Sequence, residues 1–170
     1  VKTPASGLAQ QFELSRAMYE GVLESQAALQ KMRVLRGHIK KAQEAVAKAQ
    51  SPAEVTEVLA AFDKKAAALE GGAGGAGGPG GMGGQMGPGG PGAAGAQDTL
   101  SGISGSLNSL MNMLQEADAA PTSQLVAAVT ERRQALSALL GKWESFRTLE
   151  LAALNTVLKA ANLPEITLER

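Results

Sequence analysis

The chain has 170 residues, with Lys and Arg exactly balanced by Asp and Glu, and it contains no cysteine. Zero net charge gives no electrostatic reason to expect a nucleic-acid partner or an anionic membrane surface. Without cysteine there are no disulfides and no thiolate chemistry, and no apolar run is long enough to span a bilayer. Aromatic residues make up only 3 % of the chain and strand-like alternation is absent, so we expect an all-α fold.

The first predicted helix extends from about residue 6 to Ala49. Small and apolar residues recur there every three or four positions, which indicates one continuous packing seam. The seam consists of Leu14, Met18, Gly21, Ser25, Ala28, Met32, Leu35, Ile39, Ala42, Val46 and Ala49. The amino-terminal third carries a second apolar face that one partner helix cannot cover, formed by Leu8, Phe12, Tyr19, Val22 and Leu23.

The second predicted helix starts at the sequence Ser51-Pro52-Ala53-Glu54. Ser51 can cap the helix, Pro52 suits its first position, and Glu54 completes a capping box. Gly71 then ends the helix, because glycine readily takes the left-handed conformation of a helix terminus. The predicted core residues of this helix are Val55, Val58, Leu59, Phe62, Ala66 and Leu69.

A glycine-rich segment, residues 71–96, divides the chain into a helical hairpin at 1–70 and a second one at 97–170. Its composition favours a flexible tether between two halves of one bundle domain, because glycine loses the most conformational freedom on folding. The segment contains formal matches to GxGxxG, at Gly72, Gly74 and Gly77 for example. Dinucleotide binding needs that motif between a strand and a helix, and here a helix precedes it and more glycine follows.

Asp98 or Thr99 can start the third helix, and Thr122 or Ser123 can cap the fourth after a break at Asp118–Pro121. The fourth helix is predicted to run to about Ala161, where Asn162-Leu163-Pro164 ends it. The third helix has the apolar positions Leu100, Ile103, Leu107, Leu110, Leu114 and Ala117. The fourth has Leu125, Val129, Leu136, Leu139, Leu140, Trp143, Phe146, Leu149, Leu154, Val157 and Leu158.

The predicted order is long–short, tether, short–long, and tight turns make each hairpin antiparallel. If the two long helices are also antiparallel, both turns lie at one end as a four-helix bundle, and a two-helix stalk projects at the other. The stalk would expose a contiguous apolar patch, which usually marks a contact surface. The predicted interface residues are Phe12, Tyr19, Val22, Leu23, Phe146, Leu149, Leu151 and Leu163.

Residues suited to catalysis or metal binding do not cluster in the sequence, and we expect no catalytic, metal or cofactor site in this segment. His38 is the only histidine and cannot anchor zinc alone. Trp143 and Phe146 are better explained as core or interface residues than as a ligand platform. The basic end of the first helix, from Lys31 to Lys48, is predicted to form ion pairs rather than bind phosphate. Its expected acidic partners are Glu54, Glu57, Asp63, Glu116 and Asp118.

The third and fourth helices carry a family resemblance. The stretches Leu107–Gln115 and Ala117–Thr122 resemble the carboxy-terminal helical region of large bacterial sortilin-like (VPS10/BNR-repeat) β-propeller proteins, often labelled glycosyl-hydrolase-like. Leu151–Asn155 with Leu163-Pro164 is similar to the end of that region, and Gln11–Leu14 to its start. These are packing and turn motifs, so no catalytic residue is carried over. The resemblance implies a propeller before Val1, as a docking partner, and a secreted or periplasmic location.

The leading functional hypothesis is a non-catalytic helical docking module, the carboxy-terminal part of a larger bacterial β-propeller protein. Its partner would be the propeller or a second copy of the chain. The alternative is a free-standing, self-associating coiled-coil adaptor or structural assembly protein. An enzyme would need a pocket with convergent polar groups, and the sequence offers no set of residues for one.

Overall fold

The computed structural model describes residues 5–49, 52–71, 98–116 and 120–168. Within these residues the chain is helical and contains no strand, so the predicted all-α class is confirmed. The elements in order are α1 (Ala5–Lys48), α2 (Ala53–Glu70), α3 (Leu100–Glu116), α4 (Ser123–Ser145), the π-helical turn η1 (Phe146–Glu150) and α5 (Leu151–Ala160).

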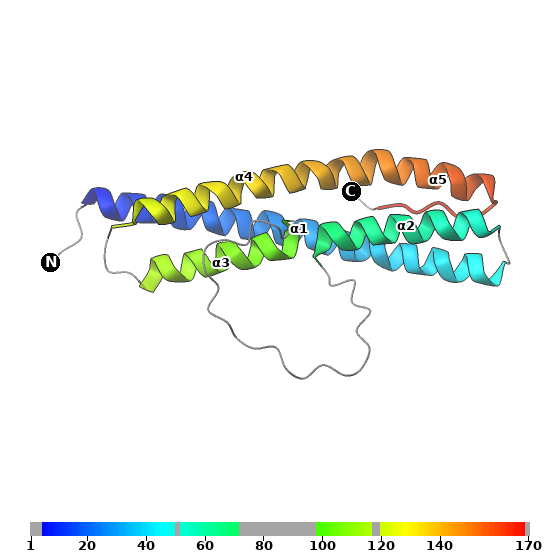
Figure 1. The fold of residues 1–170 in the computed structure, drawn as a ribbon, viewed down its shortest axis with the longest axis horizontal. Coiled ribbons are helices and arrows are strands. Elements are labelled where there is room, and N and C mark those ends of the chain that lie inside the picture. Colours follow the sequence, from blue (N-terminus) through cyan, green and yellow to red (C-terminus); the bar gives the residue numbers. More distant parts are fainter. Residues whose placement is uncertain (1–4, 50–51, 72–97, 117–119, 169–170) are drawn as a thin grey trace, which may run out of the picture.

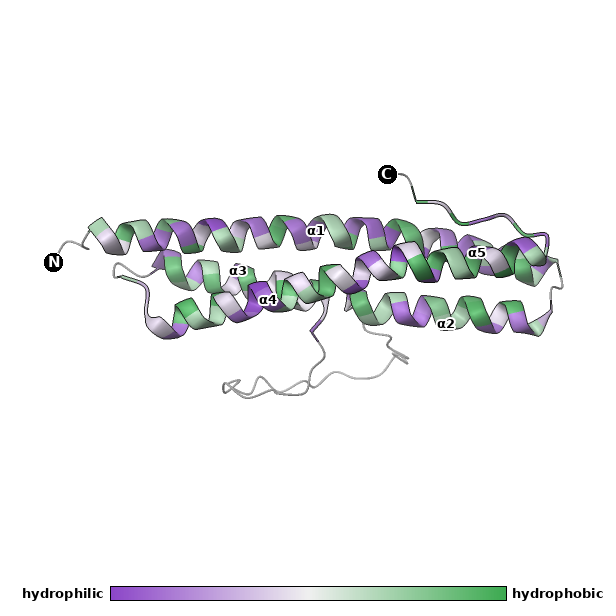
Figure 2. Cartoon of the chain, turned by 90° about the horizontal axis from the view of Figure 1, so that it is seen from above, coloured by the Kyte–Doolittle hydropathy of each residue, from purple (hydrophilic) through white to green (hydrophobic). Residues whose placement is uncertain are grey.

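The helices pack into one elongated bundle (Figure 1). α1 extends along the whole molecule, and α2 returns antiparallel beside its second half. α3 continues in the same direction beside the first half of α1, and α4, η1 and α5 then run parallel to α1. Figure 2, turned by 90°, shows the same order, with α3 and α2 following one another along the axis. One half of the bundle therefore consists of α1, α3 and α4, and the other of α1, α2 and α5.

The carboxyl end of α2 meets the amino end of α3. Gly71 ends α2 in the left-handed conformation, with φ of 83°, as predicted. A Cβ atom added at Gly71 would collide with the side chains of Thr99 and Ser101. The Thr99 hydroxyl accepts a hydrogen bond from the Gly102 N–H at 3.1 Å, so the predicted cap of α3 is also found. Together α2 and α3 form one interrupted helix. Of the predicted tether, residues 71–96, all but Gly71 lie outside the described residues.

The arrangement of the two hairpins differs from the predicted one. α1 and α4 are parallel, so the α1–α2 and α3–α4 connections lie at opposite ends of the bundle (Figure 1). Helix length explains this outcome, because α2 has 18 residues and α3 has 17, against 44 in α1. Placed end to end, the short helices cover α1 along nearly its whole length, whereas side by side they would leave half of its apolar seam in water. The described helices consequently form no two-helix stalk.

The seam predicted on α1 forms the centre of the core. Its residues are buried from Met18 to Val46, apart from the half-buried Ala42. Gly21 lies in close contact with two helices, since a Cβ there would approach Leu107 of α3 and Arg133 of α4 to 2.7 Å. The buried Ser25 hydroxyl donates to the Val22 carbonyl at 2.8 Å, which satisfies it within the helix. The small residues of the seam thus let two neighbouring helices pack against α1.

A π-helical turn separates α4 from α5, where one continuous helix was predicted. From Leu136 to Phe146 the buried positions recur every three or four residues, and the next buried position is Leu151, five residues on. The Leu151 N–H accordingly donates to the Phe146 carbonyl, five residues earlier. The extra residue turns Leu149 outward, where it is 69 % exposed, and brings Leu151 into the core. This insertion is a typical π-bulge.

Caps and the carboxyl terminus agree with prediction in part. The Thr122 side chain accepts from the Leu125 N–H at 3.2 Å and caps α4 as expected. At α2 the capping residue is Pro52, with no side-chain hydrogen bond, and the predicted cap Ser51 lies outside the described residues. α5 ends at Ala160, and Asn162, two residues later, has φ of 55°.

Residues 163–168, here called the strap, run back along α5 toward the middle of the bundle (Figure 1). The Asn155 side chain holds the strap with two hydrogen bonds: it donates to the Ile166 carbonyl at 2.9 Å and accepts from the Ile166 N–H at 2.8 Å. Ile166 is buried in the core. The His38 ring contacts the Thr167 carbonyl through Nδ1 at 3.1 Å, and this links α1 to the strap.

Candidate protein interface on the outer face of helix α1

Large apolar side chains remain exposed along one line at the amino-terminal half of α1. They are Leu8, Phe12, Tyr19 and Leu23, with exposed fractions of 54, 64, 55 and 47 %. At 100° per residue the four positions fall within an arc of about 60° on the helix surface. We call these four residues the α1 stripe.

The stripe points away from the rest of the bundle. On the same part of α1 the buried residues are Gly7, Met18, Gly21, Val22 and Ser25, and Gly21 faces α3 and α4. The solvent face of a bundle helix is normally polar, because apolar side chains there gain nothing from folding. The α1 stripe is therefore an apolar surface that the described fold leaves uncovered.

Charged side chains beside the stripe are paired within the same chain. Arg16 donates to the Glu20 carboxylate at 2.9 Å, and this hydrogen bond raises the pKa of Arg16. Arg133 of α4 bonds to Glu24 of α1 at 2.9 Å, at the contact between α1 and α4 rather than beside the stripe. A partner that covers the stripe would thus meet charges that already have partners of opposite sign.

The structure divides the predicted interface residues between two regions. Phe12, Tyr19 and Leu23 lie on the stripe, together with Leu8, which belonged to the predicted second apolar face. Val22 belongs to that predicted face as well, but it is buried at 6 % exposure. Of the four predicted interface residues on α1, three are therefore exposed on one surface, and Val22 is not.

The carboxy-terminal half of the prediction is corrected. Phe146 and Leu151 are buried in the opposite half of the bundle, where the Phe146 ring stacks on Phe62 of α2 at 4.3 Å between centroids. Leu163 is half-buried in the strap, and Leu149 is exposed on η1 away from the stripe. Because α1 and α4 are parallel, the start of α1 lies beside the start of α4 and far from Phe146.

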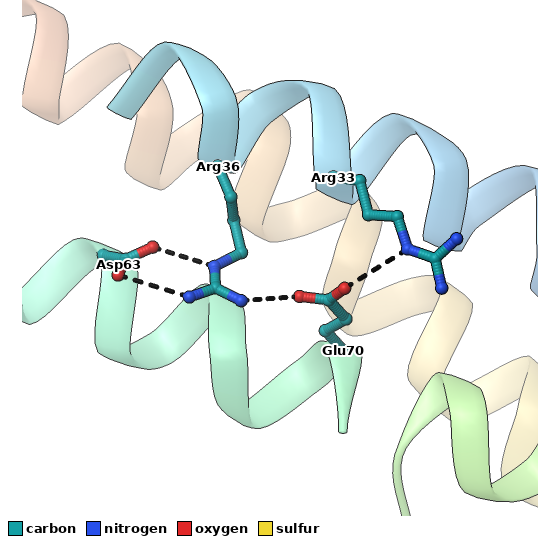
Figure 3. A network of polar contacts seen from close by, with 4 residues as sticks. All are labelled: Arg33, Arg36, Asp63 and Glu70. Atoms are coloured by element: carbon teal, nitrogen blue, oxygen red, sulfur yellow. Dashed lines mark hydrogen bonds and ion pairs between the residues drawn. The ribbon is translucent and has the colours of Figure 1, made fainter. Parts of the chain in front are cut away.

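A polar network joins α1 to α2 in the half of the bundle without the stripe (Figure 3). Arg36 donates to Asp63 at 2.9 Å and to Glu70 at 2.8 Å, and Arg33 approaches Glu70 at 3.5 Å. The hydrogen bond with Asp63, followed by that with Glu70, raises the pKa of Arg36 further above its ordinary value. Asp63 was a predicted partner, whereas Glu70 was missed although it is the last residue before the predicted helix end at Gly71.

Two other predicted features of the basic end can be placed. Glu116 ends α3 at the far end of the bundle, so it cannot pair with the basic end of α1 (Figure 1), and Asp118 lies outside the described residues. His38 contacts the strap through a backbone carbonyl rather than an acidic side chain. These contacts fasten helices and strap to each other, which is a structural role.

An apolar hollow of about 390 Å³ lies between α2 and α5. Its walls include Val58, Phe62 and Leu154, and its charged groups are Lys65 and Glu150, which pair with each other at 2.8 Å. A second hollow of about 340 Å³ adjoins the same ion pair on the side of Phe146 and Leu69. The second hollow is also lined by Lys142 and Ser145, but the Ser145 hydroxyl is not hydrogen-bonded to a base, as acyl or phosphoryl transfer would need.

Within the described ranges, no three or more His, Cys, Asp or Glu side chains are grouped so that they could hold a metal ion. None of the helices described is long and apolar enough to cross a membrane. Comparison with known proteins finds no family model, no curated protein and no solved structure that matches this chain. The resemblance to sortilin-like propeller proteins therefore stays a prediction.

Proposed function

We propose that this chain is a non-catalytic interaction module that docks onto another protein through the α1 stripe. The observation that carries the proposal is the position of the four stripe residues. Each is about half exposed or more, all lie on one line, and the opposite face of the same helix already packs in the core. A contiguous exposed apolar surface of this kind usually marks a contact site.

The expected strength of such docking follows from the area left to bury. Full burial of a large apolar side chain contributes ~1.5–3 kcal/mol, and the stripe residues have about half of that still to gain. Four of them would supply roughly 3–6 kcal/mol before the costs of association. The stripe alone therefore supports a weak, reversible contact, and polar contacts at its rim would have to add to it.

A docking role accounts for the molecule better than catalysis. The hollow between α2 and α5 has apolar walls, and its Lys65–Glu150 pair is internally neutralised. The apolar side chains of the stripe, in contrast, are left exposed by the other described helices. Two occupants were predicted from the sequence: a propeller domain that precedes the chain, as the resemblance implies, and a second copy of the chain.

Photo-crosslinking in the cells that make the protein tests the proposal. A benzophenone amino acid placed at Tyr19 is expected to capture a protein at the stripe, with a specific adduct visible by mass. The matched control carries the same group at Leu149, which is 69 % exposed but lies on η1. If Tyr19 gives no adduct, or if Leu149 gives the same adducts, the stripe is not a docking surface.

A further inference from the structure

The spacing of the α1 stripe is the same in both directions along the helix. Leu8 and Phe12 are four residues apart, as are Tyr19 and Leu23, with seven residues between the two pairs. The outer positions are both leucine, and the inner positions are both single-ring aromatics. The midpoint of the stripe falls between Ser15 and Arg16.

From this symmetry we infer that the occupant of the stripe is the stripe of a second copy, packed antiparallel about a two-fold axis. The inference rests on the proposed docking function and names its partner. A two-fold interface requires a patch that is complementary to itself. Reversing the helix places Leu8 opposite Leu23 of the second copy, and Phe12 opposite Tyr19 of the second copy. Parallel pairing needs no such symmetry, so the palindrome favours the antiparallel dimer. Val34, also exposed at 49 %, lies outside the palindrome on the second half of α1.

The residues at the midpoint suit a two-fold axis. Ser15 is small and uncharged, so it allows the two helix backbones to approach there. Arg16 lies at the edge of the same turn, and the axis would bring its two copies near each other. Each Arg16 already forms an ion pair with Glu20 at 2.9 Å and interacts electrostatically with Glu13. These carboxylates would compensate the charge of the two guanidinium groups near the axis.

The dimensions favour a dimer that exchanges with monomer. The stripe spans about 22 Å along the helix at 1.5 Å per residue. Two stripes of this size bury less than the roughly 1,200 Å² typical of stable complexes, which corresponds to a weak and concentration-dependent association. Antiparallel packing would also set the helix dipoles of the two copies in opposite directions, which is the favourable arrangement.

Cysteine crosslinking decides between the possible pairings, because the natural chain has no cysteine of its own. In the full chain, Ser15→Cys is expected to form a disulfide with itself under mild oxidation. An equimolar mixture of Leu8→Cys and Leu23→Cys chains, distinguished by mass, should give mainly the mixed disulfide. The control Lys40→Cys, exposed on the second half of α1, should stay monomeric. Disulfides of Leu8→Cys or Leu23→Cys each with itself would overturn the antiparallel arrangement.

Sedimentation of the full chain over a wide concentration series measures the association itself. We expect a monomer–dimer equilibrium, and we expect Tyr19→Glu to raise the dimer dissociation constant about tenfold or more, because a charge would be buried in the seam. Leu149→Glu, which adds the same charge to an exposed apolar site elsewhere, should leave the constant unchanged. A strict monomer at every concentration would overturn the inference. If Tyr19 nevertheless captured a different protein in cells, the proposed docking function would survive with another partner.

Discussion

Glycine has opposite roles at two positions of the bundle. Gly37 is exposed in the middle of α1, and a Cβ added there meets no atom within 4 Å. Gly71 has φ of 83° and faces the side chains of Thr99 and Ser101. Gly37 only lowers the stability of α1, whereas the junction between α2 and α3 requires a glycine at position 71.

Alanine substitution at these two positions is expected to change stability in opposite directions. Gly37→Ala should raise the free energy of unfolding by about 0.5–1 kcal/mol, since alanine loses less entropy in a helix. Gly71→Ala should lower it by about 1–3 kcal/mol through strain and collision. Urea denaturation measures both, with Gly141→Ala as a second site in open space. A neutral Gly71→Ala would contradict the close contact of α2 with α3.

Asn155 is the residue on which the strap depends. Asn155→Ala would leave the Ile166 N–H and carbonyl without the partners they have at 2.8 and 2.9 Å. We expect a loss of about 1–3 kcal/mol in the free energy of unfolding, the usual penalty for unsatisfied buried groups. Amide hydrogen exchange at Ile166 should accelerate. The neighbouring Thr156→Ala is the control, because it removes an exposed hydroxyl and its hydrogen bond to the Ala152 carbonyl but no contact with the strap. Equal exchange at Ile166 in both variants would show that Asn155 does not hold the strap.

At the scale of elements, the interruption between α2 and α3 determines how the chain crosses the middle of the bundle. Gly71 and Thr99, the described residues near either end of the segment 72–97, lie close to each other, so a short connection can join the two helix ends. Closing a flexible loop becomes less favourable by about 0.6 kcal/mol for each doubling of its length. Replacement of 72–97 by about six residues, roughly two halvings, should therefore raise the free energy of unfolding by about 1 kcal/mol.

Thermal and urea unfolding of the shortened chain measure this effect. A control with the same segment replaced by a Gly/Ser sequence of equal length should unfold like the natural chain. Marked destabilisation of the short variant alone would mean that the ends of α2 and α3 do not adjoin.

The contact of α1 with α2 depends on Arg36 as well as on apolar packing. Arg36→Met removes three hydrogen bonds, two to Asp63 and one to Glu70, and leaves Glu70, whose side chain is only 13 % exposed, with the longer contact to Arg33. We expect the free energy of unfolding to fall by about 1–2 kcal/mol. Lys159→Met, which removes a 3.9 Å exposed pair with Glu165, should change it by less than about 0.5 kcal/mol. Urea midpoints that fall equally in both variants would argue against the network.

For the whole molecule, the parallel course of α1 and α4 separates two phenylalanines that one predicted patch had combined. Phe146→Ala should lower the free energy of unfolding by about 3–5 kcal/mol, as for a buried aromatic. Phe12→Ala, at 64 % exposure, should change monomer stability by less than about 1 kcal/mol. Chemical denaturation at low protein concentration makes the comparison. Similar losses for the two variants would mean that Phe12 and Phe146 are equally buried, contrary to this structure.

Much of the local structure could be predicted from the sequence. The three-four periodicity located the helices, and Gly71, Thr99 and Thr122 end or cap them where expected. Phe12, Tyr19 and Leu23 were identified because they exceed what one seam can bury. The π-turn could not be placed from the sequence, because Leu149 continues the three-four pattern and only burial reveals the step of five between Phe146 and Leu151. Glu70 could not be chosen as the partner of Arg36, since several acids of α2 were equally eligible by charge.

The residues alone determined the helical class, the helix boundaries and the surplus of apolar side chains near the start of α1. These depend on periodicity and capping, which act between neighbours along the chain. Only the tertiary structure decided that α1 and α4 are parallel, that α2 and α3 lie end to end, and that Phe146 is core while Phe12 is surface. An apolar seam is compatible with either direction of its neighbour, and the choice is made by the length of buried surface that all the helices can cover together.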